Sequence, residues 1–597
     1  MYLISFWKKA LPFLAIALIT LWSCQKDVND FGPSPTDQIP DLTTKVNASV
    51  SGFVTDENNA AMSGATVTVG TRTTTTDQYG YFEVKNVDVV KTAAVVTVSK
   101  PGYFHGIKTF VAAQGKSAFF RIKMILKNNV GAINATSGGN VTLTNGMIVA
   151  LPGNSVVNAA TGVTYNGMVN VAAYWINPTS QYVNAEMPGD LRGLNTAGAI
   201  KALQSFGMVA VELTGASGEL LQIASGQKAT VTFPIPASLT ASAPSDIPLW
   251  YFDEAIGLWK EEGVATKIGN NYVGEVAHFS FWNCDVPANY VQFDCTVLDA
   301  DLSPIPYALV RITDLGNPYN ARAGYTDSSG YVAGLVPDNA NLKLEVFTYQ
   351  ACTSPAYTQT FTTNNTAVSL GNIVIPNTAL NQAAVSGTVT DCNNNPVTAG
   401  SIIVLKDNQY FRYGIGSNGT YSFASLLCSG PTTVTLIATD ANSSQQSTPV
   451  TATFVNGPVT IPNIQACGIS TNQFMNYTIN GTSYAYSSPV DSFYMSINSQ
   501  STTSQIIISA EQFSPGQNGY GTIIFDAPGI AVGSSQAFNY FYCSQVSDSM
   551  SIVPPFNVNI TEYGNIGEFI AGDFAGTMNG ISTSYVVSGN FRVRRRQ

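Results

Sequence analysis

Few residues of this chain could do acid–base chemistry. There are two histidines, His105 and His278, and they lie far apart in the sequence. A tryptophan-rich segment also holds four acids, which are Asp253, Glu254, Glu261 and Glu262. A glycosidase needs two carboxyl groups about 5–10 Å apart in a cleft. These acids instead flank an expected hairpin turn at 255–257, where charges usually protect a strand edge from pairing. His278 lies between apolar residues, which favours a core histidine over a metal ligand.

Motifs that carry catalysis are missing from the sequence. It contains no Gly-rich phosphate loop, no Gly-x-Ser-x-Gly elbow, no His-Glu-x-x-His and no Cys-x-x-Cys pair. We therefore expect no enzymatic activity, no catalytic residue, no cofactor and no metal site. The net charge of −10, from 27 basic and 37 acidic residues, argues against nucleic acid as a partner.

The sequence offers one candidate ligand-binding surface, formed by the tryptophans Trp250, Trp259 and Trp282. In one interpretation they form an aromatic platform for sugar rings. In the other they alternate into the core of a β-sandwich, which is the usual place for large aromatic side chains. The core interpretation is the more common one for such a pattern.

The composition predicts the elements that must position these residues. Charged residues make up 11% of the chain and apolar residues 45%, and the remainder is rich in Thr, Ser, Asn and Gly. That mixture favours strands and polar turns over helices. A length of 597 residues suggests about four or five domains. We predict an all-β, elongated chain of tandem β-sandwich domains.

A repeated unit supports this fold class. Three segments begin with an alternating strand that ends in an acid, namely Asp56, Asp299 and Asp391. In each segment a second strand begins nine residues later, at Ala65, Ala308 and Gly400. A constant spacing in three places indicates an internal repeat.

A tight turn follows in each copy. The first two copies use Asp77-x-x-Gly80 and Asp327-x-x-Gly330, where the Asp can cap backbone N–H groups and the Gly supplies a positive φ. The third copy has Gly416 at the Asp position, so we expect another group to cap its turn. These motifs resemble the carboxypeptidase regulatory-like domain, a seven-stranded β-sandwich related to transthyretin-like and Cna B-type modules. The resemblance assigns residues 46–126, 287–376 and 377–467 to three such domains.

Two segments lie outside the repeat. Residues 127–286 begin with Gly138-Gly139, a strand, and then Pro152-Gly153, which resembles the ZU-type β-sandwich and implies a protein-binding or mechanical role. Residues 468–597 form a C-terminal β domain in which Gly-x-Phe steps on consecutive strands suggest close backbone packing. This domain resembles small C-terminal β domains of Bacteroidota-type surface lipoproteins.

The N-terminus has the pattern of a targeting segment. Lys8 and Lys9 precede an apolar run from Leu11 to Trp22, which is shorter than the roughly 20 residues that span a bilayer. The run ends in Leu-Trp-Ser-Cys and resembles a lipobox, which makes residues 1–23 a lipoprotein signal peptide and Cys24 the lipidation site. The residues after it, Gln25, Lys26 and Asp27, resemble an export signal for the outer face of the outer membrane. The polar stretch 24–45 is then a flexible tether.

The remaining cysteines are predicted to pair in part. The chain has eight cysteines, and seven remain once Cys24 carries lipid. Outside the reducing cytosol they can form disulfides. We expect Cys295 to pair with Cys352 and Cys392 with Cys428, and at least one thiol to stay free and buried.

These observations predict a non-enzymatic, surface-exposed lipoprotein anchored in the outer membrane. The leading hypothesis is a binding or adhesion module for a glycan or a surface protein, carried on a β-sandwich stalk. The alternatives are a purely structural spacer or component of an outer-membrane complex, and a glycan-degrading enzyme with accessory domains. Five sandwiches in a straight line would extend over roughly 100 Å, from strand lengths of about 25 Å each. This arrangement places the C-terminal domain farthest from the membrane.

Overall fold

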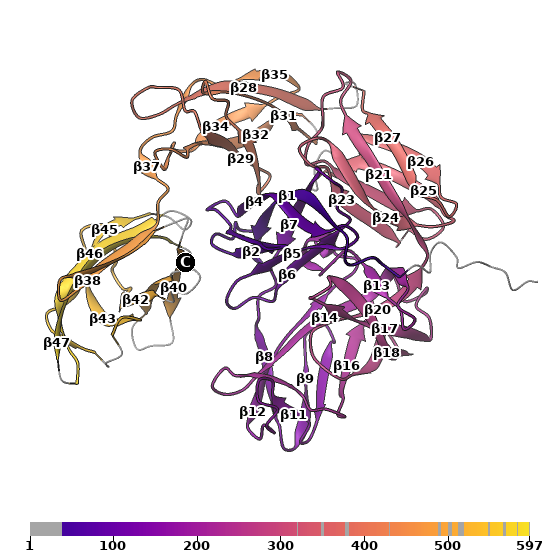
Figure 1. Cartoon of the computed structure of the whole chain (residues 1–597), viewed down its shortest axis with the longest axis horizontal. Helices are drawn as coiled ribbons and strands as arrows, with labels where there is room; N and C mark the ends of the chain where they lie inside the picture. The colour runs from indigo at the N-terminus through magenta and orange to yellow at the C-terminus, as the bar shows by residue number, and fades with distance from the viewer. Residues whose placement is uncertain are drawn as a thin grey trace, which may run out of the picture.

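The computed structural model describes residues 39–595, except for 319, 348–351, 377–380, 429, 488–490, 499–503, 512–518, 547–549, 565–568 and 582. Within these residues the regular secondary structure is almost entirely β-strand, with one short helix, α2 (Val183–Glu186). The strands form five successive domains (Figure 1), which confirms the predicted all-β class of tandem β-sandwiches. The predicted lipidation and export residues, Cys24, Gln25, Lys26 and Asp27, lie outside the described residues. No helix in the described part is both long and apolar enough to span a bilayer.

The first domain, here called the first sandwich, packs a three-stranded sheet against a four-stranded one. The three-stranded sheet has the order β4 (Tyr81–Val90), β1 (Lys45–Thr55), β7 (Ser117–Lys123). The other has the order β3 (Arg72–Thr75), β2 (Thr66–Val69), β5 (Ala94–Ser99), β6 (Gly106–Phe110). Alternate residues of β5 are buried, with Ala94, Val96 and Val98 in the core. The period-2 pattern of the sequence thus fixes which side of each strand faces inward.

The second sandwich repeats this topology. Its three-stranded sheet is β24 (Tyr331–Pro337), β21 (Tyr290–Leu298), β27 (Val368–Val374). Its four-stranded sheet is β23 (Ala321–Tyr325), β22 (Leu309–Asp314), β25 (Asn341–Phe347), β26 (Tyr357–Thr362). The first and last strands pair in parallel, as they do in the first sandwich.

The third sandwich follows the same plan. One sheet holds β31 (Thr420–Leu426), β28 (Gln382–Thr390), β35 (Gly457–Thr460) and β36 (Ile464–Gln465). The other holds β30 (Gln409–Gly414), β29 (Gly400–Lys406), β32 (Thr432–Asp440), β33 (Gln445–Gln446), β34 (Val450–Phe454) and β37 (Ile469–Ser470). Three copies of one strand order confirm the internal repeat.

The turns of the three copies are built as their sequences predict. Asp77 accepts hydrogen bonds from the backbone N–H groups of Tyr79 and Tyr81 through one carboxylate oxygen, at 2.8 and 3.0 Å. Asp327 does the same in the second copy. In the third copy Asn418 caps the N–H of Thr420 at 3.2 Å, so a neighbouring amide takes the role that Gly416 cannot. The turn glycines all have positive φ, which is +74° at Gly80, +75° at Gly330 and +78° at Gly419.

The middle domain spans β8 to β20, whose strands belong to one 13-stranded sheet folded around a large core, and a second buried cluster packs against the first sandwich. Its strands are β8 (Asn129–Asn134), β9 (Gly138–Thr142), β10 (Ile148–Pro152), β11 (Val156–Asn158), β12 (Met168–Ile176), β13 (Arg192–Leu194), β14 (Ile200–Thr214), β15 (Leu220–Ile223), β16 (Ala229–Pro234), β17 (Asp246–Asp253), β18 (Leu258–Ile268), β19 (Asn271–Val276) and β20 (Phe281–Ala288). The ZU-type resemblance of this segment stays a prediction.

The C-terminal domain spans β38 to β47 and forms a ten-stranded sheet. Its strands are β38 (Phe474–Ile479), β39 (Thr482–Ser487), β40 (Ser492–Asn498), β41 (Gln505–Glu511), β42 (Tyr520–Asp526), β43 (Ser535–Cys543), β44 (Ser551–Val553), β45 (Asn557–Tyr563), β46 (Phe569–Asn579) and β47 (Ser584–Arg594). On β46 and β47, Gly572 lies opposite Phe591 and Phe574 opposite Gly589. The Gly-x-Phe steps therefore let each ring lie over a bare backbone, as the close packing predicted from the sequence requires.

The disulfides differ from the predicted pairs. Cys352 pairs with Cys428, with their Cα atoms 5.1 Å apart, and Cys392 pairs with Cys467, at 5.0 Å. The predicted pairs Cys295–Cys352 and Cys392–Cys428 are therefore wrong. Cys295 is a free, buried thiol in the core of the second sandwich. Cys352 instead reaches the neighbouring domain, because its side chain packs in the core of the third sandwich.

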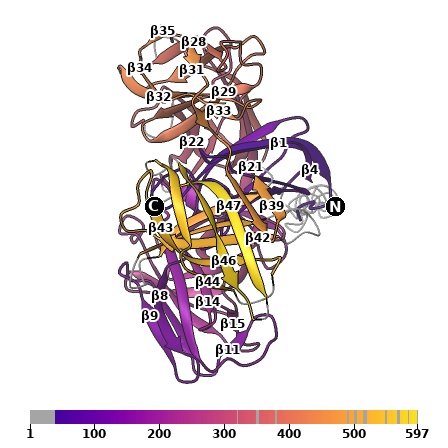
Figure 2. The ribbon, with the colours of Figure 1, turned by 90° about the vertical axis from the view of Figure 1, so that its left-hand side faces the viewer.

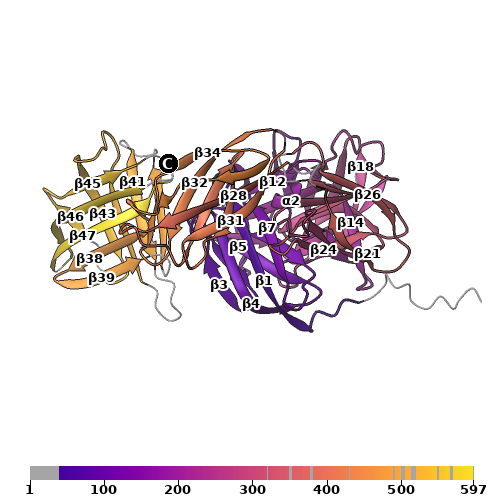
Figure 3. The same cartoon turned by 90° about the horizontal axis from the view of Figure 1, so that it is seen from above.

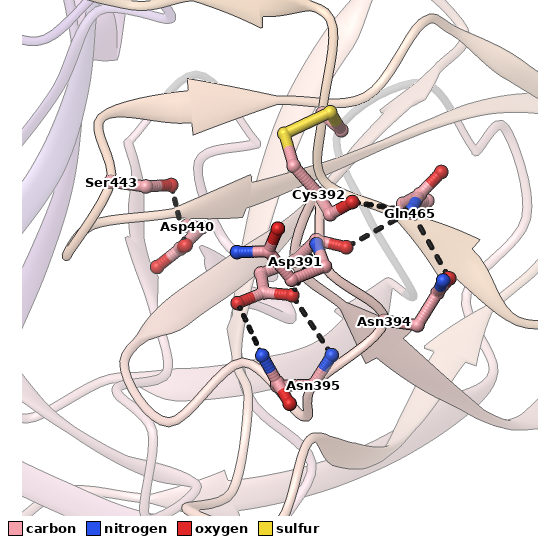
Figure 4. Close-up of a disulfide and its surroundings, with 9 residues drawn as sticks. Asp391, Cys392, Asn394, Asn395, Asp440, Ser443 and Gln465 are labelled. Atoms are coloured by element: carbon pink, nitrogen blue, oxygen red, sulfur yellow. Dashed lines mark hydrogen bonds between the residues drawn. A yellow bond between two sulfur atoms is a disulfide. The ribbon is translucent and has the colours of Figure 1, made fainter.

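The Cys392–Cys467 bridge closes the third sandwich at its two ends in sequence (Figure 4). Cys392 lies in the first turn of the domain, directly after Asp391, whose carboxylate accepts two backbone N–H groups of that turn. Gln465 lies two residues before the other cysteine and donates to the carbonyls of Asp391 and Cys392, at 3.1 and 3.4 Å. This turn is thus fixed by both a covalent bond and side-chain hydrogen bonds. The free thiols of the described chain are Cys284, Cys295 and Cys543, and all three are buried.

The domains form an elongated body (Figure 3), but they do not follow a straight line. The first sandwich lies in the middle of the molecule, and the later domains are arranged around it (Figures 1 and 2). Asp77 of its turn forms an ion pair with Arg412 of the third sandwich at 2.6 Å. The neighbouring Gln78 accepts a hydrogen bond from Arg594 of the C-terminal domain. The chain therefore curves back on its own beginning, and the straight stack predicted from the strand lengths is wrong.

Candidate functional site

The tryptophans predicted as a ligand surface lie in the core. Trp250, Trp259 and Trp282 are all 0% exposed. The indole N–H of Trp250 donates to the carbonyl of Asp285, and that of Trp282 donates to the carbonyl of His278. The platform interpretation is therefore wrong. Trp282 packs in the core of the middle domain, as the core interpretation predicts. Trp250 and Trp259 are buried in a second cluster, which Phe104 and Ile107 of the first sandwich complete, so these two rings are covered by a neighbouring domain.

The acids and histidines of this segment make structural contacts. Asp253 pairs with Lys260 at 3.3 Å, and Glu254 with His105 of the first sandwich at 2.8 Å. The second pair joins two domains, and the hydrogen bond to Glu254 raises the pKa of His105. His278 packs against the rings of Tyr251 and Trp282, and burial lowers its pKa. Among the described residues, no group of three or more His, Cys, Asp or Glu side chains is arranged to hold a metal ion.

An exposed aromatic surface exists elsewhere, on the C-terminal domain. Tyr494 on β40 is 44% exposed, and Tyr540 and Tyr542 on β43 are 42% and 48% exposed. The intervening residues of β43, such as Phe541, are buried in the domain core. We call the outward side of β40 to β43 the tyrosine face. It consists of Tyr494, Tyr520, Tyr540 and Tyr542 with Ser509, Thr522, Ile507 and Ile524.

Strand pairing arranges the tyrosine face in two rows. In one row the register runs Tyr494, Ser509, Thr522 and Tyr542 across four strands. In the next row it runs Ser496, Ile507, Ile524 and Tyr540. At the usual strand spacing, the first row separates its two tyrosines by roughly 14 Å. The face thus combines ring surfaces at its two sides with hydroxyl and aliphatic groups between them.

Three of the rings form a cluster. The ring centroids of Tyr520 and Tyr542 lie 5.2 Å apart at 34°, and those of Tyr540 and Tyr542 lie 6.3 Å apart at 30°. A side-chain hydrogen bond with Tyr542 raises the pKa of Tyr520 to about 12, so this phenol is neutral at ordinary pH. Within the first row, the hydroxyls of Ser509 and Thr522 are hydrogen-bonded at 2.9 Å. These groups can stack on a ligand and exchange hydrogen bonds with it.

These tyrosines were not among the site residues predicted from the sequence. The signal was the alternation Asn539-Tyr-Phe-Tyr-Cys543, which places two tyrosines on one side of a strand. Alternation alone does not tell which side faces solvent. The tryptophan segment has the same kind of pattern, and there the largest rings are inside.

Comparison with solved structures gives weak overlaps with pilin proteins. The major pilin subunit BcpA of Bacillus cereus is 10% identical, with 71% of this chain and all of that chain covered, at a TM-score of 0.12. A streptococcal ancillary pilin is 11% identical, with 38% of this chain and 96% of that chain covered, at a TM-score of 0.14.

Sequence comparison gives matches to parts of the chain. Cartilage intermediate layer protein 2 of Mus musculus is 27% identical over 158 residues, which are 25% of this chain and 13% of that protein. The match thus concerns a small part of that relative. The family model of the carboxypeptidase regulatory-like domain matches residues 49–124. This match confirms that the first copy of the repeat is similar to a carboxypeptidase regulatory-like domain, as its motifs predicted.

Proposed function

We propose that this protein is a non-enzymatic, surface-exposed lipoprotein that binds a glycan through the tyrosine face of its C-terminal domain. The observation that carries the proposal is the cluster of exposed tyrosines on one sheet face. Monomeric proteins rarely expose contiguous apolar surface without using it. Tyrosine is also suited to recognition, since its ring is rigid and apolar while its hydroxyl forms hydrogen bonds.

A glycan fits this face better than an apolar protein surface. A sugar ring has an apolar C–H side that stacks on an aromatic ring, and hydroxyls at its edge. The rows of the tyrosine face offer both partners, with Tyr494 and Tyr542 at the sides and Ser509 and Thr522 between them. Each row runs across four strands, which suits a chain of several sugars lying across the strands.

The two disulfides support a location outside the cytosol, since reducing compartments keep thiols unpaired. In this proposal Cys24 carries the lipid, Gln25, Lys26 and Asp27 direct export to the cell surface, and the outer membrane is the partner of the anchor. Replacing Cys24→Ala should release the protein from membranes. Replacing Lys26→Ala and Asp27→Ala together should keep the lipid but protect the chain from external protease. Membrane retention of the Cys24→Ala variant would contradict the anchor.

Ligand binding is tested with the full mature chain carrying Cys24→Ala. A glycan array identifies candidates, and calorimetry then compares Tyr540→Ala and Tyr542→Ala with the parent. Each substitution should weaken binding about two- to tenfold, from the 0.5–1.5 kcal/mol of an aromatic contact. The matched control is Tyr174→Ala, because Tyr174 is also exposed, at 36%, but lies on β12 of the middle domain.

Three outcomes would overturn the glycan proposal. If no glycan binds, a spacer role becomes the better interpretation. If a protein binds and the tyrosine variants abolish that binding, the face is a protein interface. If Tyr174→Ala weakens glycan binding as much as Tyr542→Ala does, the site lies elsewhere.

A further inference from the structure

A cavity of about 190 Å³ lies where the first sandwich, the middle domain and the second sandwich meet. Its walls include β7 from the first sandwich, β23 and β24 from the second, and residues 187–191 after helix α2. A single water needs only about 10–15 Å³ of such space. The cavity is therefore large enough for a molecule the size of a small ring, and three domains contribute to it.

The lining of the cavity holds more basic than acidic residues. Its basic residues are Lys108, Lys116, Arg121 and Arg322, whereas its one acid is Asp190. Asp190 is paired with Arg192 outside the cavity lining, at 2.8 Å. Lys108 donates to two backbone carbonyls at 2.7 Å each, and Arg322 donates to the carbonyls of residues 203 and 321.

Arg121 differs from these other basic groups. Its guanidinium has five N–H donors, and it makes one hydrogen bond, to the carbonyl of Tyr410 at 3.2 Å. Aromatic rings surround it, with Phe411, Phe53 and Phe119 centred 4.9, 5.3 and 5.6 Å away. Within the described residues, no carboxylate lies within salt-bridge distance of it.

The remaining N–H groups of Arg121 keep some exposed surface. None of its nitrogens is both fully buried and without a partner, so those that make no hydrogen bond are accessible. Arg121 lines the cavity described above and also a second one of about 130 Å³ on its other side. The aromatic rings stabilise this cation through cation–π contacts, but they do not accept its in-plane N–H groups. A bound anion would supply that acceptor.

We propose that this three-domain cavity binds a small organic carboxylate, with Arg121 as its counter-ion. A planar guanidinium matches a carboxylate through two parallel hydrogen bonds. The body of the ligand would lie against the apolar walls of the cavity, which include Phe119, Phe293 and Ile312. An inorganic anion would satisfy Arg121 but would leave most of this apolar space unfilled, so the geometry favours a carboxylate attached to a ring or an aliphatic chain.

The first test uses the unmodified protein sequence from Gln25 onward, so that its folding is not in question. Benzoate, hexanoate and glucuronate are compared with benzamide, hexanamide and sodium sulfate by thermal shift and calorimetry. At least one of the carboxylates should bind at least tenfold more tightly than its amide and than sulfate. Glucuronate, which has no amide in the set, is compared with glucose. Failure of all three carboxylates to bind would overturn the proposal, and so would sulfate binding of equal strength.

Substitutions then locate the site. Arg121→Gln should weaken carboxylate binding at least tenfold. Arg121→Lys should weaken it less, because lysine keeps the charge but lacks the two parallel N–H donors of the guanidinium. The control is Arg72→Gln, since Arg72 is exposed on β3 of the same sandwich and lies outside both cavities. Circular dichroism checks folding of each variant. Unchanged affinity in a folded Arg121→Gln variant would place the carboxylate elsewhere and overturn the assignment.

Discussion

The disulfide between Cys352 and Cys428 connects two domains, and its removal gives a sharp test of the domain arrangement. The perturbation is the double substitution Cys352→Ala and Cys428→Ala, which leaves no unpaired thiol behind. The two cysteines are separated by 76 residues. In the chain-entropy relation, a loop of that length stabilises the folded state by about 4.5 kcal/mol.

The expected loss is smaller than this upper value. The two disulfide loops overlap in sequence, so each bond shortens the loop that the other closes, and measured effects are typically about 2–4 kcal/mol. A loss of about 3 kcal/mol lowers the Tm of a unit of 150–250 residues by roughly 6–12 °C. The second and third sandwiches together form a unit of this size.

The chain provides a matched control. Cys392 and Cys467 are separated by 75 residues, so their removal changes chain entropy by nearly the same amount. That bond lies within the third sandwich, whereas Cys352–Cys428 joins it to the second. Both double variants should lower the Tm of this two-sandwich unit, but the Cys352→Ala, Cys428→Ala variant should also let the second sandwich unfold separately from the third, as an additional transition. Calorimetry resolves these transitions, and peptide mapping without reductant identifies the bonds.

Two results would refute this reasoning. A Tm unchanged to within about 1 °C in the Cys352→Ala, Cys428→Ala variant would show that the bond does not constrain the chain. A peptide that links Cys295 to Cys352 would show that the second sandwich closes its own disulfide.

Two further predictions concern a turn glycine and the two histidines. Gly80→Ala should destabilise the first sandwich more than Gly115→Ala in urea unfolding. Both glycines have a positive φ, +74° and +72°. A Cβ at Gly80 would lie 2.2 Å from a carbonyl oxygen of β1, whereas a Cβ at Gly115 would meet open space. Gly115→Ala should cost about 1–2 kcal/mol from its backbone conformation alone, and equal losses would contradict the steric argument. The histidines should titrate on opposite sides of the ordinary pKa of 6.5 in an NMR titration, with His105 above it because of its hydrogen bond with Glu254 and His278 below it because of burial. The contribution of His105 to stability is therefore full below pH 6.5 and is lost as the pH rises through its raised pKa. His278, in contrast, destabilises the fold as the pH falls through 6.5. Coincident titration curves for the two histidines would refute both assignments.

Features that depend on neighbouring residues were predictable from the sequence. The turn acids bind backbone N–H groups two and four residues away, as at Asp77 and Asp327, so the motif itself contains both partners. The absence of Asp at Gly416 likewise predicted a different cap, and Asn418 provides it two residues further along the chain. Strand alternation is local in the same way, and it indicated the repeated sandwiches without any information on long-range contacts.

Features that depend on distant contacts were not predictable. Cys352 and Cys295 belong to the same repeat, yet Cys352 bonds to Cys428 of the next domain. No local pattern records which of several cysteines will approach it. The site at Arg121 was even less predictable from local patterns. Residues from separate domains surround it, and they meet only because the chain curves back.

The sequence by itself therefore determined the all-β class, the threefold repeat, the turn chemistry and the absence of known catalytic motifs, because each rests on local spacing and composition. The tertiary structure decided which aromatic side chains are exposed. Trp250 and Tyr542 both lie on alternating strands, but the first is fully buried and the second is 48% exposed. Alternation separates the two faces of a strand, and only the packing of another sheet against one face determines which of them meets solvent.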